Sequence, residues 1–209
     1  MSRNGPKAGA AHEAAVQHFL DVALGELQAV AAALEPADVR RAAEAIRAAE
    51  AEAGRVHVTG IGKSEHVARY GAALLSSTGT PAAFLHATEA THGSVGQVRP
   101  ADVVIALSNS GQTPELLDAV EALAGFGARI VAVTGERESA LARRADCVLS
   151  ARVAREGGPL ELAPRASVLA QTLVLQALSV SLQAGRDFTR EDYHRRHPAG
   201  ALGRKSARP

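Results

Sequence analysis

The chain of 209 residues is poor in aromatic side chains, has a single cysteine and carries almost no net charge. Aromatic residues make up 3% and tryptophan is absent, which argues against a surface that stacks on nucleic-acid bases. Lysine and arginine (23) nearly balance aspartate and glutamate (22), so the basic excess of a typical DNA- or RNA-binding protein is missing. The lone Cys147 cannot form an internal disulfide and fits a reducing compartment. We therefore expect a cytoplasmic protein with no nucleic-acid partner.

The sequence also lacks the long apolar segments that mark leaders and membrane spans. Its first twenty residues contain no unbroken apolar core of a signal peptide, and no stretch approaches a bilayer-spanning length. We expect no membrane partner. Hydrophobic residues still make up 46%, enough for one α/β domain with a single core. A small, polar segment over 1–10 predicts a flexible tail, 11–205 a single domain, and 206–209 a second tail.

Hydrophobic spacing predicts two helices over 11–34 and from Pro36 to about Ala53, followed by alternating strands and helices. Strands are expected at 55–60, 82–86, 102–108, 129–135 and 146–153, and helices at 63–79, 114–127, 139–145 and 165–184. This alternation with short loops predicts a parallel sheet covered by helices on both faces. The helix at 165–184 is apolar around most of its circumference, which predicts burial in the core or against another subunit.

The loop "TGIGKS" (59–64) follows the first predicted strand, at the sheet edge where ligands of parallel sheets bind. A Walker A loop would need a glycine in place of His57, and a dinucleotide fingerprint would need one in place of Glu65. What remains is a glycine loop with Lys63 and Ser64 at the start of a helix. That arrangement suits an anion site or an ordinary tight turn.

The loop "SNSGQT" (108–113) ends a buried strand with several polar residues: Ser108, Asn109, Ser110, Gly111 and Thr113. The hydroxyl groups can donate hydrogen bonds, the glycine lets the backbone approach a ligand closely, and the next helix offers free N–H groups. Helix capping alone needs one such residue. The excess favours a phosphate-binding loop.

Two further segments carry titratable side chains. His86, Glu89 and His92 lie in the segment 86–96, but their spacing matches no strong zinc motif, so structural histidines are favoured over a metal site. Glu156 follows the last predicted strand and precedes Gly-Gly-Pro. It is either a solvated loop residue or a general base at the ligand edge, and its position alone does not decide.

Together, these loops resemble the SIS (sugar isomerase) domain, and more closely the arabinose-5-phosphate isomerases of the KdsD/KpsF/GutQ family. The resemblance spans roughly residues 55–205, and the pairing of "SNSG" with "HPAGALGR" is its specific part. The other segments are "GIGKSEHVAR", "SSTGTPAAFLH", "HGSVGQVRPADVVIALSNSGQTPEL", "VTGERESALARRADCVL" and "APRAS". It implies a three-layer α-β-α SIS fold with a five-stranded parallel sheet flanked by helices. It also implies a homotetramer with active sites at subunit interfaces.

The same resemblance implies reversible aldose–ketose isomerisation through an enediol(ate), interconverting D-arabinose 5-phosphate and D-ribulose 5-phosphate with no cofactor. In that reaction Glu156 would move the carbon-bound proton, Lys63 would lie near the oxyanion, and Glu115 would orient a histidine. His92 and His197 would transfer the hydroxyl protons. The phosphate would be bound by Ser64, Ser108, Asn109, Ser110, Gly111 and Thr113.

The chain departs from the family's pattern in three places. It ends at Pro209 without the pair of CBS domains that many relatives carry, so regulation through them is expected to be absent. It reads Arg165-Ala166-Ser167-Val168 where relatives are rich in serine and threonine, and "HATEATHGS" where relatives read "HPGEAAHGD". His86, Arg165 and Ser167 are therefore candidate specificity residues. Two alternatives stay open: an isomerase of a hexulose or heptulose phosphate, and a non-catalytic sugar-phosphate-binding protein.

Overall fold

A five-stranded sheet forms the centre of the structure, a computed structural model that describes residues 6–206. Every neighbouring pair of strands is parallel, and the strand order is β2-β1-β3-β4-β5. The strands are β1 (Val56–Gly60), β2 (Ala82–Phe84), β3 (Val103–Ser108), β4 (Arg129–Thr134) and β5 (Cys147–Ser150). The predicted five parallel strands are thus confirmed, each within a few residues of its expected bounds.

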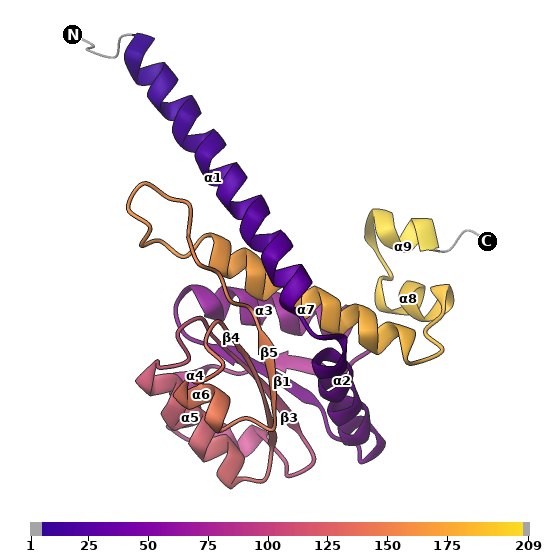
Figure 1. The fold of residues 1–209 in the computed structure, drawn as a ribbon. Coiled ribbons are helices and arrows are strands. Elements are labelled where there is room, and N and C mark those ends of the chain that lie inside the picture. The colour runs from indigo at the N-terminus through magenta and orange to yellow at the C-terminus, as the bar shows by residue number, and fades with distance from the viewer. Residues whose placement is uncertain (1–5, 207–209) are drawn as a thin grey trace.

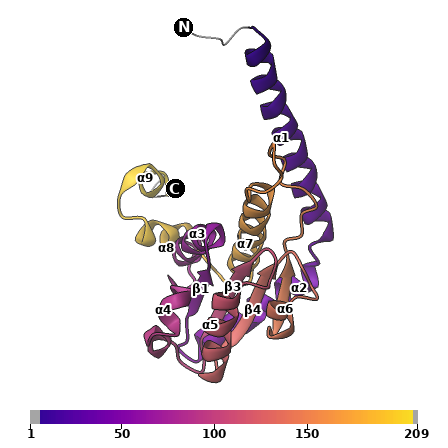
Figure 2. The same ribbon diagram turned by 90° about the vertical axis from the view of Figure 1, so that its left-hand side faces the viewer.

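Helices cover both faces of the sheet, so the predicted three layers are also confirmed (Figures 1 and 2). Successive residues of a strand point to opposite faces, and Ile105 and Val104 accordingly belong to two separate hydrophobic clusters. The Ile105 cluster includes α2 (Pro36–Ala51), α3 (Lys63–Ser77) and α7 (Ala166–Ala184). The Val104 cluster includes α4 (Ala87–Ala90), α5 (Pro114–Gly125) and α6 (Ala140–Arg143).

The first helix, α1 (Pro6–Ala33), is longer than predicted and projects from the body of the molecule (Figure 1). Residues 6–10, expected to form a tail, are its first turns, because proline fits a helix start and the lysine and alanines that follow favour a helix. Residues 1–5 lie outside the described range. Val16, Leu20 and Leu24 recur every four residues on α1 and are 59%, 45% and 61% exposed. They form an apolar stripe with no partner among residues 6–206.

Four of the described helical segments were not predicted, the short α4 among them. The other three are the 3-10 helix η1 (Ser94–Gln97), α8 (Arg190–Arg196) and α9 (Gly200–Ser206). The start of α8 is a capping box: Thr189 Oγ1 accepts from the amide of Asp192, and the Asp192 carboxylate accepts from the amide of Thr189. The expected tail over 206–209 therefore starts one residue too early, since Ser206 is helical and 207–209 lie outside the described residues.

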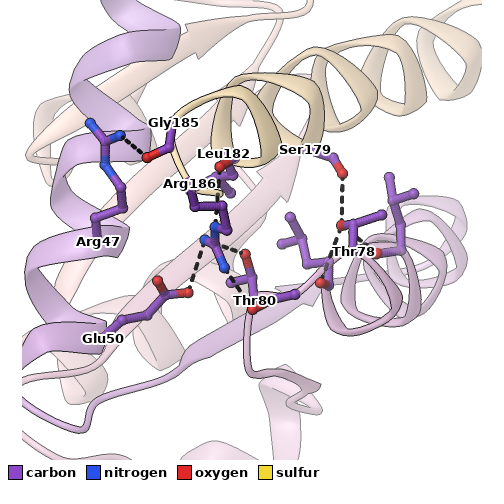
Figure 3. A network of polar contacts seen from close by, with 11 residues as sticks. Arg47, Glu50, Thr78, Thr80, Ser179, Leu182, Gly185 and Arg186 are labelled. Atoms are coloured by element: carbon purple, nitrogen blue, oxygen red, sulfur yellow. Dashed lines mark hydrogen bonds and ion pairs between the residues drawn. The ribbon is translucent and has the colours of Figure 1, made fainter. Parts of the chain in front are cut away.

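Helix α7 crosses one face of the sheet and is anchored at its C-terminal end by Arg186 (Figure 3). The Arg186 guanidinium donates to the carbonyls of Leu182 and Gly79 (3.1 and 2.6 Å), to Thr80 Oγ1 (2.9 Å) and to Glu50 (3.1 Å). Gly79 and Thr80 precede β2. The C-terminal end of α7 therefore lies at the amino edge of the sheet, and its N-terminal end lies toward the carboxyl edge.

Helix α7 is also the one helix among residues 6–206 that is long and apolar enough to cross a membrane by length and composition. Half of that window is buried within the fold, where Ala170, Val174 and Leu178 contribute to the core. The prediction of burial in the core is confirmed for this side of the helix. Val180, on another side, is exposed.

Candidate active site at the carboxyl edge of the sheet

The chain changes direction across the sheet between β1 and β3. These two strands are neighbours, yet β1 leads into α3 on one face and β3 leads into α5 on the other. Gly60 at the end of β1 pairs with Leu107 near the end of β3, so the loops 61–62 and 109–113 diverge from adjacent points. Such a switch point is where ligands bind in open parallel sheets.

Two uncapped helix ends meet this switch point. The N-cap residues are Gly62 for α3 and Thr113 for α5, and no N-cap side chain accepts a hydrogen bond from either helix. The amides of Ser64 in α3 and Glu115 in α5 make no hydrogen bond with the described residues and can donate to a ligand, and the two helix dipoles favour negative charge. Lys63, the first residue of α3, is exposed and adds a positive charge. The region suits a phosphate group.

The loop 108–113 contains two kinds of serine. Ser108 is buried, and its Oγ accepts a hydrogen bond from the amide of Gly111 (3.0 Å) and lies 3.2 Å from Thr113 Oγ1. Ser110 and Asn109 are exposed, and Ser110 Oγ accepts from the amide of Gln112. From the sequence, all of these polar residues were expected to bind the phosphate directly. In the structure Ser108 shapes the loop from inside, and the exposed side chains are those available to a ligand.

Glycine is required at position 111 for two reasons. Its φ is +60°, and a Cβ there would overlap Ser139 Oγ and lie 2.9 Å from Thr134 Oγ1. The loop is thus packed directly against the ends of β4 and α6.

Glu156 shares a cavity of about 420 Å³ with Asn109. Its Oε2 accepts hydrogen bonds from the amides of Arg165 (2.6 Å) and Ser167 (3.1 Å) at the start of α7. The carboxylate therefore caps α7 from a distance in sequence, and it is a fixed group rather than a freely solvated one. Oε1 makes no hydrogen bond with the described residues and remains able to accept a proton.

The backbone on either side of Glu156 is held by two more carboxylates. Glu161 Oε2 accepts from the amides of Glu156 (2.7 Å) and Gly157 (2.9 Å). Glu26, on α1, accepts from the amides of Ala154 (2.8 Å) and Arg155 (3.1 Å). The hydrogen bonds from the Gly157 and Glu156 amides lower the pKa of Glu161, with a smaller contribution from Arg155. Neither Glu26 nor Glu161 was among the predicted residues.

The two candidate histidines of the segment 86–96 lie differently. His86 Nδ1 is 2.9 Å from Thr88 Oγ1, and its Nε2 is 3.9 Å from a carboxylate oxygen of Glu65, in the first turn of α3. A hydrogen bond from Arg69 lowers the pKa of Glu65. His92 lies in an exposed turn after α4. Within residues 6–206, no group of three or more His, Cys, Asp or Glu side chains is placed to share a metal ion.

The remaining predicted residues divide by location. Glu115 is exposed in the first turn of α5, and Ser64 is half-buried in the first turn of α3. Arg165 is exposed and its Nε lies against Gly158. Ser167 is buried, and its Oγ has no hydrogen-bond partner among the described residues.

His197 is separated from all of these within one chain. Phe188, just before α8, packs against Gly79 at the amino edge of the sheet. His197 ends α8, where its ring stacks on Tyr193 with centroids 3.9 Å apart. The other candidate residues lie at the opposite edge.

The SIS domain family model matches residues 51–181. The arabinose 5-phosphate isomerase KdsD of Shigella flexneri is 47% identical over 152 residues, which cover 73% of this chain and 46% of that protein. The arabinose 5-phosphate isomerase KpsF of Escherichia coli is 43% identical over 73% of this chain and 48% of its own length. The chain thus spans about half the length of the curated relatives it matches.

Among solved structures, that of E. coli CFT073 c3406 in complex with arabinose 5-phosphate superposes with a TM-score of 0.82. It is 33% identical, and the match covers 95% of this chain and all of that one.

Proposed function

The chain belongs to the SIS domain family, and we propose that it is an aldose–ketose isomerase that interconverts D-arabinose 5-phosphate and D-ribulose 5-phosphate. The names of the KdsD and KpsF relatives support this substrate pair, as does the sugar phosphate bound in the c3406 complex. The observation that carries the proposal is geometric. A fixed carboxylate, Glu156, shares a cavity with Asn109, next to two uncapped helix ends suited to a phosphate.

We assign the substrate phosphate to the ends of α3 and α5. The amides of these first turns and the side chains of Ser64, Asn109, Ser110 and Thr113 would donate hydrogen bonds to it, and Gly111 lets the backbone approach. Ser108 belongs to this group through the shape it gives the loop. Anchoring the phosphate here leaves the carbonyl end of a five-carbon sugar to reach toward Glu156.

Isomerisation then needs one base and one stabilised oxyanion. Oε1 of Glu156 removes the proton from C2 of the aldose, and the C–H electron pair forms the C1=C2 bond of an enediolate. The negative charge collects on O1, near which we place the ammonium group of Lys63. Glu156 returns the proton to C1, and His92 and His197 exchange the hydroxyl protons, one of them oriented by Glu115. The ketose results, with no net loss of atoms or electrons.

The position of His197 leads to a proposal about assembly. Because it lies far from Glu156 within one chain, we assign it to the site of a neighbouring subunit in a homotetramer. The exposed stripe of Val16, Leu20 and Leu24 on α1 supports association with further copies. Mixing inactive Glu156→Gln and His197→Ala chains should then restore activity, since some sites would receive two intact residues. Mixtures as inactive as their components, or a monomer in light scattering, would contradict this assignment.

The substrate is tested with a panel of pentose, hexose and heptulose phosphates, following C2 proton exchange by NMR. Exchange with arabinose 5-phosphate well above the others supports the proposal, and preference for a longer sugar favours the alternative isomerase. Binding without any exchange identifies a sugar-phosphate-binding protein instead. The Arg165→Thr variant, measured on the same panel, tests Arg165 as a specificity residue. An unchanged preference among the sugar phosphates would show that Arg165 does not determine specificity.

We place the protein in the cytoplasm, where Cys147 stays reduced.

A further inference from the structure

The segment 154–157 connects β5 to α7 and is neither helical nor a strand. Its four consecutive backbone amides all donate hydrogen bonds to glutamate carboxylates. Glu26 accepts from Ala154 and Arg155, and Glu161 accepts from Glu156 and Gly157. The two carboxylates come from opposite directions in the sequence: Glu26 lies 128 residues before Ala154, and Glu161 lies five residues after Glu156. The arrangement fixes the backbone on both sides of Glu156.

The backbone of Glu161 itself is in a strained conformation. Its φ is +51°, in a region that residues with a side chain rarely adopt. Such strain persists only where surrounding contacts hold it, and it is concentrated at functional sites. Here its carboxylate binds two amides and also accepts from Arg155 Nη2 at 3.3 Å. Glycine would suit this φ better but would lose all three contacts, so the strained glutamate is retained at a cost in backbone energy.

The Arg155 side chain connects the same contacts to α1. Its Nη2 lies 3.1 Å from His18 Nε2 on α1, while its backbone amide binds Glu26 on the same helix. The side chain of Glu156, in turn, is held by the amides of Arg165 and Ser167. Backbone and carboxylate of Glu156 are therefore fixed independently.

We propose that Glu161 and Glu26 are positioning residues that hold Glu156 in place to move the C2 proton, an inference that rests on the proposed isomerase function. Glu161 also lines the cavity that Glu156 shares with Asn109, but its carboxylate is occupied by the two amides and by Arg155. Each positioning carboxylate acts through the backbone of the segment 154–157, and a proton-transfer step is sensitive to displacements of this kind, because an error of about 1 Å can cost on the order of 100-fold in rate.

The decisive variant is Glu161→Gly, because it separates positioning from stability. Glycine relieves the positive φ, which offsets part of the stability lost with the three contacts, so the melting temperature should change little. We expect kcat to fall about 10- to 100-fold while KM changes less than about threefold, since binding of the phosphate is untouched. Glu161→Gln keeps a carbonyl that accepts from both amides and should retain most of kcat. Glu52→Ala, an exposed glutamate at the C-terminal end of α2, serves as the matched control.

Hydrogen exchange gives a second readout that does not depend on turnover. Exchange at the amides of Glu156 and Gly157 should become faster in Glu161→Gly, and at Ala154 and Arg155 in Glu26→Ala, with the Glu52→Ala control unchanged. Faster exchange together with reduced kcat supports the proposal. Parental kcat in Glu161→Gly, or parental exchange at both amides, overturns it. If the parent turns over no sugar phosphate, the isomerase proposal fails and the catalytic role of these carboxylates fails with it, while the exchange data still decide whether they hold the segment.

Discussion

Oε2 of Glu156 lies 2.6 Å from the backbone nitrogen of Arg165, the N-cap residue of α7, so Glu156 caps this helix from nine positions earlier in the chain. Glu156→Ala should therefore lower the free energy of unfolding by about 0.5–2 kcal/mol, the usual cost of losing a cap. Glu156→Gln should be nearly neutral, because its carbonyl oxygen can accept from both amides while its NH₂ group replaces Oε1. Urea denaturation of the two variants checks this, and equal stability of Ala and Gln would refute the capping role.

The serines of the loop 108–113 should separate stability from ligand binding. Ser110→Ala removes an exposed hydroxyl, so stability should change by less than about 0.5 kcal/mol while sugar-phosphate binding weakens by about 0.5–1.5 kcal/mol. Ser108→Ala removes a buried hydroxyl with two partners and should reduce both stability and binding. Calorimetric titration with a sugar phosphate, paired with thermal unfolding, distinguishes them. Parental affinity in the Ser108/Ser110 double alanine variant would show that the loop does not hold the phosphate.

Alanine substitutions at Gly111 and Gly93, two glycines with positive φ, should separate the cost of steric overlap from the cost of backbone strain. Gly93 has φ +111° and open space around its Cβ position, so Gly93→Ala should cost only the backbone strain, roughly 1–2 kcal/mol. Gly111→Ala adds overlap with Ser139, which should cost a further ~1–3 kcal/mol. Equal losses in the unfolding free energy of the two variants would mean that the loop yields to the added methyl group.

The buried pair of Asp102 and His57, at the amino edge of the sheet, should make the free energy of unfolding depend on pH. Asp102 Oδ2 lies 2.9 Å from His57 Nε2, and the Asp102 carboxylate also accepts from the amides of Arg99 and Arg55. Burial disfavours the charged carboxylate, but these hydrogen bonds outweigh it and hold the pKa of Asp102 below its usual 3.8. The stabilisation is thus present above the unfolded pKa and is lost as pH falls through the lower folded value.

Asp102→Asn keeps the shape of the side chain but replaces one carboxylate oxygen by an NH₂ group. That group would face N–H donors in place of the acceptor they now bind. At pH 7 the variant should be less stable than the parent by roughly 3 kcal/mol. The difference should begin to shrink below the usual pKa of 3.8, where the unfolded parent binds a proton at Asp102, and should go on shrinking until the pH falls below the lower folded pKa. Denaturation over a pH series from 7 down to well below 3.8 measures it. A difference that stays constant over this range would exclude a charged Asp102 as the source of the stability.

The sheet was predictable from the sequence because its signals are local. Continuous apolar runs such as 103–107 mark strands buried on both faces, and glycine or polar clusters end them, so five strands and their parallel direction could be predicted, but the order of the strands in the sheet was not. The start of α8 was also encoded locally, in the Thr189–Asp192 capping box, but the glycine and proline residues around it hid the signal. The start of α1 was misjudged because small residues suit a helix and a tail equally.

The candidate site residues could be named by type from the sequence, but their burial and their contacts could not. Nothing local separates Ser108 from Ser110, since burial depends on how β3 sits against its neighbours. Glu161 and Glu26 escaped notice for a different reason. The Glu26 contacts join residues about 130 positions apart, and the positive φ of Glu161 contradicts its own residue preference, so neither appears in any periodic pattern.

Deuterium incorporation from D₂O into arabinose 5-phosphate and ribulose 5-phosphate tests the central claim most directly, with the parent and Glu156→Gln measured side by side by NMR. The amide variant retains the α7 cap and lacks the base, so substrate binding should be nearly unchanged. We expect exchange at C2 of the aldose in the parent and a loss of about 10²–10⁴-fold in the variant. Parental exchange rates in Glu156→Gln would contradict it and transfer the base to Glu115 or His92.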